Sequence, residues 1–248
     1  MTNGGGWYPV ALSNGIETGT SSGTRLLGEE IVIWRDGAGA AHIWEDRCPH
    51  RGMRLSFGYV RSDRIACLYH GWQYGTDGQC LYVPAHPDLK VPPTITTWRH
   101  TCREEMGMIW GHLREASDAP AIPAEVADGT VVPVRSIHVD CSADVLADRL
   151  TASAFEPFNE ALATGARRSA RREGPLVVVT IANGDLSETL IGGVQPLTAE
   201  RCALHLVVVA SAGDYRGAGQ VHFARIAEML RSDLETGAVG VASAPTKQ

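Results

Sequence analysis

The chain has 248 residues, of which 44% are hydrophobic and 20% charged, and its formal net charge is −6. This composition is ordinary for a globular protein and gives no reason to expect nucleic acid as a partner. The N-terminus lacks a basic start followed by an apolar run, and no stretch reaches the roughly 18 apolar residues of a membrane span, so we expect neither a secretory signal nor a membrane partner.

The first half of the chain is predicted to consist of short strands joined by turns. Residues 31–46, IVIWRDGAGAAHIWED, indicate a β-hairpin whose turn holds two glycines. Residues 64–82 repeat that form around Asp77-Gly78. Prolines are frequent in residues 84–98, which predicts a loop over much of this stretch, and EEMGMIWGHL, residues 104–113, is predicted to be a single closing strand.

The second half changes character after a predicted linker at residues 114–129. Residues 142–165 show helical spacing of apolar residues, with Ser142 as the candidate N-cap. Three strands and a final amphipathic helix are predicted after it. They cover LVVVTIANG (176–184), SETLIGGVQP (187–196), CALHLVVVAS (202–211) and QVHFARIAEMLRSDLETG (220–237).

Two cysteines and two histidines have the spacing of a metal site. Cys48-x-His50 and Cys67-x-x-His70 are two short ligand pairs separated by sixteen residues. Six cysteines in this length do not make a disulfide scaffold, and the cytoplasm, where thiols stay reduced, is the simplest location to expect. A tetrahedral zinc ion and a [2Fe–2S] cluster both fit four such ligands. Zinc sites usually group cysteines together, whereas each pair here mixes one cysteine with one histidine, which favours the cluster.

The segment CPHRG…CLYHGWQY is similar to the Rieske domain of Rieske non-haem iron oxygenases, and the resemblance covers about residues 7–113. It implies a [2Fe–2S] cluster with both cysteines on one iron and both histidines on the other. Respiratory Rieske proteins carry an additional disulfide-forming cysteine in each loop, and this chain has none in that neighbourhood. The residues Arg51, Trp72 and Tyr74 flank the ligands and either tune the cluster or pack around its loops.

The same resemblance implies a second domain with a mononuclear iron on two histidines and a carboxylate. Its motif, Asp-x-x-His-x-x-x-x-His on a helix, aligns with DRLTASAFEPFNE, residues 148–160, and places Ala152, Phe155 and Glu160 at the three ligand positions. A looser alignment puts the remaining acidic ligand near Ile226, with Glu228 or Asp233 in other registers. We therefore expect no mononuclear iron in this chain.

The remaining candidates in the second half are weaker. Isolated histidines are the more ordinary interpretation of His138, His205 and His222, although a triad of His205, His222 and Asp214 is the alternative. The run ARRSARRE, residues 166–173, is predicted to be a solvated loop or a docking patch for an acidic partner. The other cysteines are expected to be small buried hydrophobic residues: Cys80, Cys102, Cys141 and Cys202.

The resemblance implies an α+β chain of two domains. An N-terminal all-β Rieske domain is expected at residues 1–115, followed by a shortened helix-grip domain of antiparallel sheet plus helices at residues 130–238. Residues 239–248 are expected to form a flexible tail.

We expect a Rieske electron-transfer subunit of a heteromeric oxygenase that is not catalytic alone. Family trimers pass an electron from one subunit's cluster to its neighbour's iron, so a partner oxygenase subunit, trimer-like ring packing and a reductase or ferredoxin donor are implied. The alternatives are a stand-alone Rieske ferredoxin-like carrier and a complete oxygenase with an atypical iron site.

Overall fold

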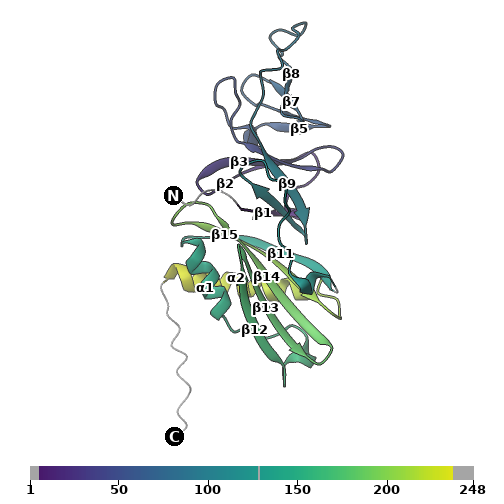
Figure 1. Ribbon diagram of the computed structural model, residues 1–248, viewed down its shortest axis with the longest axis vertical. Coiled ribbons are helices and arrows are strands. Elements are labelled where there is room, and N and C mark those ends of the chain that lie inside the picture. The colour runs from purple at the N-terminus through teal and green to yellow at the C-terminus, as the bar shows by residue number, and fades with distance from the viewer. Residues whose placement is uncertain (1–5, 128, 237–248) are drawn as a thin grey trace.

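The computed structural model describes residues 6–127 and 129–236 and has an elongated shape (Figure 1). A four-stranded sheet lies at one end, and a five-stranded sheet with two α-helices lies at the other (Figure 1). The strands of the first half are β1 (Tyr8–Leu12), β2 (Ser21–Leu26), β3 (Glu29–Arg35), β4 (Ala41–Glu45), β5 (Tyr59–Arg61), β6 (Arg64–Ala66), β7 (Gln73–Gly75), β8 (Cys80–Tyr82), β9 (Arg99–Glu105) and β10 (Met108–His112). The elements of the second half are β11 (Thr130–Val139), α1 (Ala143–Ala152), β12 (Arg167–Glu173), β13 (Leu176–Asn183), β14 (Leu186–Pro196), β15 (Cys202–Ala210) and α2 (Ala218–Thr236).

The first half forms two antiparallel sheets, in the orders β1-β10-β9-β4-β3-β2 and β5-β6-β7-β8. Both predicted hairpins are confirmed, because β3 pairs with β4 and β7 pairs with β8. The prediction of one closing strand at residues 104–113 is wrong, since residues 99–112 form the hairpin of β9 and β10. Its turn residues Met106 and Gly107 have φ of 44° and 73°, and two positive φ values suit the tight turn that joins twisted strands.

The second half forms one antiparallel sheet in the order β11-β15-β14-β13-β12. Strands β13, β14 and β15 and helix α2 confirm the predicted elements. Strand β11 was not predicted, and ARRSARRE forms the edge strand β12 rather than a loop. A nearly continuous run of polar side chains is tolerated there because an edge strand has only one strand neighbour to pack against.

Helix α1 begins as predicted but ends early. The Ser142 hydroxyl caps it by accepting from the amide of Val145. The helix ends at Ala152, so Phe155 and Phe158 lie in the irregular segment that follows, not on the helix as predicted. Pro157 disfavours helical backbone at the residue before it, which explains why the helix does not continue through this segment.

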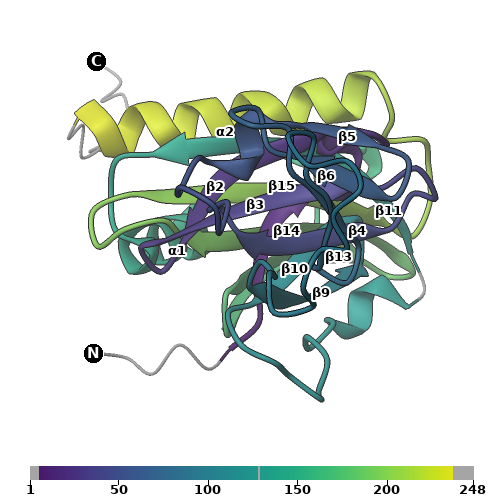
Figure 2. The ribbon, with the colours of Figure 1, turned by 90° about the horizontal axis from the view of Figure 1, so that it is seen from above.

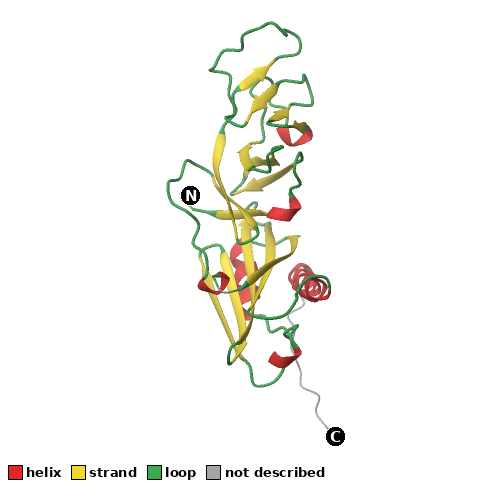
Figure 3. Cartoon of the chain, turned by 90° about the vertical axis from the view of Figure 1, so that its right-hand side faces the viewer, coloured by secondary structure: helices red, strands yellow, loops and turns green. Residues whose placement is uncertain are grey.

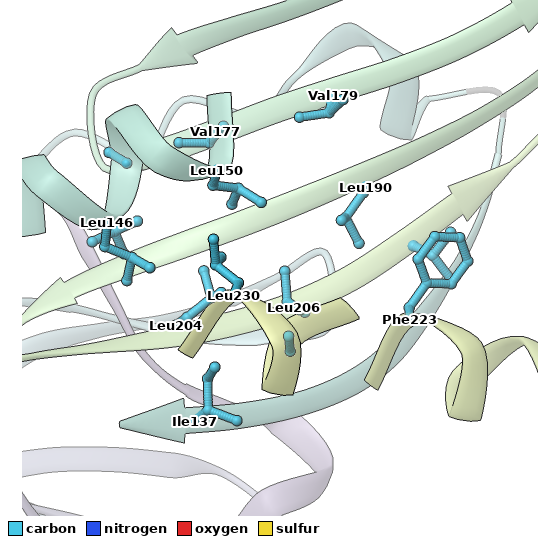
Figure 4. Packing of buried hydrophobic residues seen from close by; sticks show 14 of the residues in the cluster. Ile137, Leu146, Leu150, Val177, Val179, Leu190, Leu204, Leu206, Phe223 and Leu230 are labelled. Carbon is cyan, nitrogen blue, oxygen red and sulfur yellow. The ribbon is translucent and has the colours of Figure 1, made fainter. Parts of the chain in front are cut away.

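The three central strands of this sheet, β13, β14 and β15, are buried on both faces. On one face, alternate residues such as Val177 and Val179 pack against α1 and α2, where Phe223 and Leu230 point into the same cluster (Figure 4). Helix α2 runs along one side of the molecule when it is seen from above (Figure 2). On the other face, the intervening residues such as Val178 pack against the first half of the chain. Two-sided burial explains why these strands read as continuous apolar runs.

The two halves meet in the middle of the molecule through one shared core (Figure 3). Trp7, Met108 and Trp110 from the first half pack in the same cluster as Leu176 and Val178 from the second. The α+β prediction, an all-β first half and a sheet with helices in the second, is confirmed. The boundaries 1–115 and 130–238 stay our proposal, and the predicted tail at 239–248 lies outside the described residues.

A buried polar chain also crosses the junction. His205 Nδ1 lies 2.7 Å from the Ser136 hydroxyl, and its Nε2 lies 2.9 Å from Gln195 Oε1. The Gln195 amide then donates to the Arg25 carbonyl oxygen at 2.7 Å, which joins β14 to β2. Each side-chain polar atom of Ser136, His205 and Gln195 has a hydrogen-bond partner. The network therefore fixes the relative position of the two sheets without leaving one of these groups unsatisfied.

The folding stability should decrease as the pH is lowered, because of His205. Complete burial, with His138 nearby, lowers the pKa of His205 to about 3. The folded state therefore keeps this ring neutral while the unfolded chain takes up a proton below about pH 6.5. The stabilisation is complete above that pH and should be lost by roughly 1 kcal/mol per pH unit between about 6.5 and 3.

Urea unfolding of the wild type and of His205→Gln at several pH values checks this. The difference in unfolding free energy should be constant above pH 7 and should shift towards the variant as the pH falls. A pH-independent difference would contradict the assignment of a neutral His205.

No helix among the residues described is long and apolar enough to span a membrane.

Candidate metal centre

The two ligand pairs lie on loops that make the same turn. In each loop the cysteine amide donates to the carbonyl oxygen five residues later, and the glycine amide four residues later donates to the cysteine carbonyl oxygen. The bonds are Cys48 N to Met53 O (2.8 Å), Gly52 N to Cys48 O (2.8 Å), Cys67 N to Trp72 O (2.9 Å) and Gly71 N to Cys67 O (3.0 Å). The repeated turn brings a cysteine and a histidine from each loop to one place.

Both turns depend on a glycine in the left-handed region. Gly52 has φ of 72° and Gly71 has φ of 70°, and a side chain at either position is strained. A Cβ on Gly71 would also lie 2.9 Å from Cγ of Pro84, whereas a Cβ on Gly52 would meet nothing within 4 Å. The second loop is therefore held more tightly by its surroundings than the first.

Gly71→Ala should thus reduce iron content and stability more than Gly52→Ala does. Both variants carry the backbone strain, which costs about 1–2 kcal/mol, and only Gly71→Ala adds the clash with Pro84. Iron per chain and the urea midpoint measure the difference. Equal losses in the two variants would show that Pro84 yields without cost.

The four predicted ligands are brought together. Cys48 and Cys67 are each 2% exposed. The rings of His50 and His70 are 4.7 Å apart between centroids, in an edge-to-face arrangement on the outer side. The structure thus pairs two buried thiols with two more exposed imidazoles, one of each from each loop.

Two of the three predicted flanking residues touch ligands directly. The Trp72 ring stacks on His50, with centroids 4.2 Å apart and planes 4° from parallel. The Tyr74 hydroxyl is buried and lies 3.0 Å from Cys48 Sγ. Burial, together with the Cys48 thiol, raises the pKa of Tyr74, so its hydroxyl stays protonated and can donate to sulfur. Trp72 orients one imidazole and Tyr74 can donate a hydrogen bond to one thiolate. Arg51 stays exposed beside His50.

Burial affects the two kinds of candidate ligand differently. Burial raises the pKa of the Cys67 thiol, and the neighbouring Cys48 raises it further, while the amides of Tyr69 and His70 oppose the shift. Burial also lowers the pKa of His50, helped by His70 and Arg51. Neutral imidazoles bind metal directly, and metal displaces the thiol protons, so buried thiols with amide donors fit a bound cluster.

No group of three or more potential ligands that could hold a metal ion occurs among the described residues. Each iron of a Rieske cluster has only two protein ligands. Cys48, His50, Cys67 and His70 therefore fit a binuclear cluster, although they do not form a group of three or more ligands around one metal ion.

The positions that align with a mononuclear iron motif lie mostly around one cleft. Ala152, Phe155 and Ile226 line a cleft of about 470 Å³ between α1 and α2. Glu160, the fourth position, lies apart from the cleft lining, at the start of a short 3-10 helix, Glu160–Leu162. The same cleft is also lined by His222, Glu156 and Asp233.

The two acidic residues of α2 that other alignment registers place at the iron-ligand position, Glu228 and Asp233, form ion pairs. Asp233 lies 3.0 Å from the Arg149 guanidinium at the cleft edge. Glu228 pairs with Arg135 at 2.6 Å and with Arg231 at 2.7 Å.

The histidines of the second half stay apart from one another. His205 lies in the sheet within the polar network. His222 lies on α2 and lines the cleft, and its Nε2 is 2.9 Å from the Glu156 carbonyl oxygen. The Asp214 carboxylate accepts from the Arg216 amide. The structure does not bring the alternative triad together.

One residue of the second half was missed by sequence reasoning. Glu188 on β14 is completely buried. Its carboxylate accepts from the amides of Phe158 (3.0 Å) and Asn159 (3.1 Å) and from the Tyr215 hydroxyl (2.7 Å). It fixes the segment after α1 to the sheet. Nothing in the sequence distinguishes Glu188 from a solvent-exposed glutamate in a strand.

Two of the four arginines on the arginine-rich strand form ion pairs with neighbouring residues. Arg171 contacts Glu125 at 2.6 Å and Glu173 at 2.5 Å, and Arg172 contacts Asp144 at 2.6 Å. Arg167 and Arg168 have no ion pair among the described residues, so the contacts of Arg171 and Arg172 halve the charge of the predicted docking patch.

The four remaining cysteines are free thiols. Cys80 and Cys202 are buried, as predicted, while Cys102 and Cys141 are partly exposed.

Known proteins share both the motif and the fold. A family model described as "Rieske [2Fe-2S] domain" matches residues 6–93. "Oxidoreductase NdmD" of Pseudomonas putida is 31% identical over 211 residues, which cover 82% of this chain and 35% of that protein. "Methylxanthine N1-demethylase NdmA" of the same organism is 37% identical over 122 residues, covering 47% of this chain and 34% of that protein. The chain spans about a third of the length of these curated relatives.

Solved structures extend the similarity to the second half. An NdmA QL mutant with theobromine, from Pseudomonas putida, has a TM-score of 0.76 at 22% identity and covers 99% of this chain and 84% of that one. Apo dicamba monooxygenase has a TM-score of 0.77 at 18% identity and covers 98% and 91%. At such identities the likeness shows the fold, an N-terminal Rieske domain followed by the sheet-rich domain of those oxygenases. Residues 6–93 therefore belong to the Rieske [2Fe-2S] domain family, and the whole chain shares the fold of these solved proteins.

Proposed function

We propose that this chain is a Rieske electron-transfer subunit of a heteromeric oxygenase, which passes electrons to the mononuclear iron of a partner subunit. Cys48 and Cys67 would hold one iron and His50 and His70 the other. When bound, such a cluster takes up and releases one electron at a time. The imidazoles are the more exposed ligands, so an electron would leave through their edge of the site.

The surrounding residues support that role. Trp72 holds the His50 ring in one orientation by stacking, which limits its movement between redox states. The Tyr74 hydroxyl would donate to the Cys48 thiolate, and hydrogen bonds to cluster sulfur are one means by which a protein sets the potential. Burial of both cysteines keeps water away from the thiolates.

One contrast carries the proposal. The Rieske loops keep all four ligands in position, whereas the cleft between α1 and α2 presents Ala152, Phe155 and Ile226 where an oxygenase would hold its iron. A chain with this pair of features can carry an electron. Two cleft residues that could ligate iron are engaged elsewhere, because Asp233 pairs with Arg149 and His222 Nε2 contacts the Glu156 carbonyl oxygen. We accordingly expect a mononuclear iron only in the partner.

Metal analysis and reconstitution test the proposal. The purified chain should hold about two irons and two labile sulfides, and a third iron would favour the complete oxygenase with an atypical site. Mixing the reduced chain with a partner oxygenase subunit should give single-turnover product, and cluster-free chain carrying His70→Ala should not. Turnover that is equal with the cluster-free chain would leave only a structural role.

A stand-alone electron carrier is the second candidate. The match to an oxidoreductase over 82% of this chain favours it, because that similarity extends beyond the Rieske domain in a protein that is not named as an oxygenase. A carrier would reduce several unrelated acceptors as a monomer. Stable association with a single oxygenase in size-exclusion chromatography would speak against it.

A further inference from the structure

Two thiols outside the ligand loops lie next to each other in the second half of the chain. The Sγ atoms of Cys141 and Cys202 are 3.9 Å apart, although the two residues are 61 positions apart in the sequence. A disulfide bond holds its two sulfur atoms at about 2.0 Å, so an approach of roughly 2 Å separates these thiols from a bond. Both thiols are free in this structure, and neither belongs to the candidate ligand set.

The fold holds these two residues together where the sheet passes into the first helix. Cys202 is the first residue of β15 and pairs with Val139, the last residue of β11. The chain then reaches Cys141 and turns into α1, whose N-cap is Ser142. Because β11 and β15 are paired at this point, the backbones that carry the two thiols already lie side by side.

The two thiols differ in their access to solvent. Cys202 is completely buried, whereas Cys141 is partly exposed and lines a shallow surface pocket with Glu200 and Arg201. A small reagent in solution can therefore reach Cys141, while Cys202 is placed to react with Cys141. In thiol–disulfide exchange, this arrangement allows a mixed disulfide on the outer thiol to be resolved by the inner one.

The polar contacts that hold this junction are exposed or long. Asp140 pairs with Arg201 at 2.7 Å, but both side chains are more than half exposed. The Asp140 amide donates to the Glu235 carboxylate on α2 at 3.4 Å. Exposed ion pairs contribute little to stability. A covalent bond at this point would therefore add a restraint between α1 and the sheet that these contacts do not supply.

We propose that Cys141 and Cys202 form a reversible disulfide that stabilises the second half, with a low-molecular-weight disulfide as the oxidant. The Cys141 thiolate attacks one sulfur of the small disulfide, which forms a mixed disulfide and releases one small thiol. The Cys202 thiolate then attacks the Cys141 sulfur, which forms the bond within the chain and releases the second small thiol. The chain loses two electrons and two protons, and the small disulfide is reduced to two thiols.

The surroundings set the speed of the exchange. Burial raises the pKa of the Cys141 thiol, the contact with Cys202 opposes this shift, and the carboxylates of Glu235 and Asp140 add to it. Burial and the neighbouring Cys141 raise the pKa of the Cys202 thiol. Little thiolate is present at neutral pH, so we expect the exchange to take minutes to hours.

The bond would act mainly on the unfolded chain. It would close a loop from Cys141 to Cys202 that contains α1, β12, β13 and β14. A cross-link over a loop of this length removes much of the conformational freedom of the unfolded state, which favours the folded one.

Glutathione buffers of increasing oxidised fraction test the proposal on the holo-chain. After anaerobic equilibration, free thiols are blocked by alkylation and the peptides are mapped by mass spectrometry. The visible spectrum shows whether the cluster is kept, and urea unfolding compares the oxidised and reduced chains. The variants are Cys141→Ser and Cys202→Ser. Cys102→Ser is the matched control, because it removes a partly exposed thiol from β9 in the first half.

We expect a peptide pair joined through Cys141 and Cys202, whose yield rises with oxidised glutathione and is lost with excess dithiothreitol. The urea midpoint of the oxidised wild type and of Cys102→Ser should rise by about 1 M. Cys141→Ser should show neither effect, and it decides the matter if the buried Cys202→Ser does not fold. A stable glutathione adduct on Cys141 without the joined peptides, or a joined chain with an unchanged midpoint, would overturn the inference.

Discussion

Cys67→Ser should give a colourless protein that lacks the roughly two irons and two labile sulfides expected of the wild type. Cys67 is buried and receives amide hydrogen bonds from Tyr69 and His70, so no other side chain can take its place at the iron. A serine oxygen is a harder and more basic ligand than a thiolate and stays protonated at neutral pH. Its iron would be left open to water, and the cluster would be lost.

The measurements are iron and sulfide content together with the visible spectrum. Cys48→Ser, His50→Ala and His70→Ala should behave in the same way. Cys102→Ser on β9 is the matched control, since it removes a thiol outside the ligand loops and should keep the colour. A colourless wild type with one zinc per chain would reverse the assignment and restore the zinc site that the ligand types also allow.

Glu188→Ala should destabilise the second half more than any surface substitution. The change leaves the amides of Phe158 and Asn159 and the hydroxyl of Tyr215 without their buried acceptor. Buried donors that lose a charged partner cost roughly 3–5 kcal/mol in total. The segment after α1 should detach from the sheet, which would open the cleft beside Phe155.

Urea unfolding of two further variants calibrates this loss. Tyr215→Phe removes one donor and should cost about 1 kcal/mol, and Glu188→Gln keeps an acceptor and should lie between Tyr215→Phe and Glu188→Ala. Glu160→Ala is the matched control, because that carboxylate is exposed. A loss below about 1 kcal/mol for Glu188→Ala would mean that water replaces the carboxylate at no cost.

Local patterns predicted the elements whose cause is local. The β3–β4 hairpin follows from glycines between β-branched runs, and β13 to β15 follow from apolar runs that are buried on both faces. Helix α1 was predicted too long, because the apolar spacing continues past Ala152 while the backbone must leave the helix before Pro157. Strand β12 was missed, because its arginines look solvated until their partners on distant segments are known.

The site shows the same division. Spacing singled out Cys48, His50, Cys67 and His70 as candidate ligands, and two turns of equal form bring these four residues together. The contact of Tyr74 with Cys48 was open to two interpretations, since a tyrosine near a motif does not reveal where its hydroxyl points. The bonds of Glu188 join residues about thirty positions apart, and no local pattern records such a partner.

The core shared by Trp7, Met108 and Trp110 with β13, β14 and β15 bears on why the chain keeps its second half. Severing the chain between the halves would expose an apolar surface on each fragment, and each would then be prone to aggregate. Natural selection for a foldable product is thus sufficient to preserve the C-terminal half, whatever happens to the residues lining its cleft. A gene reduced to the ligand loops and their strands would first have to acquire a polar replacement for that buried face.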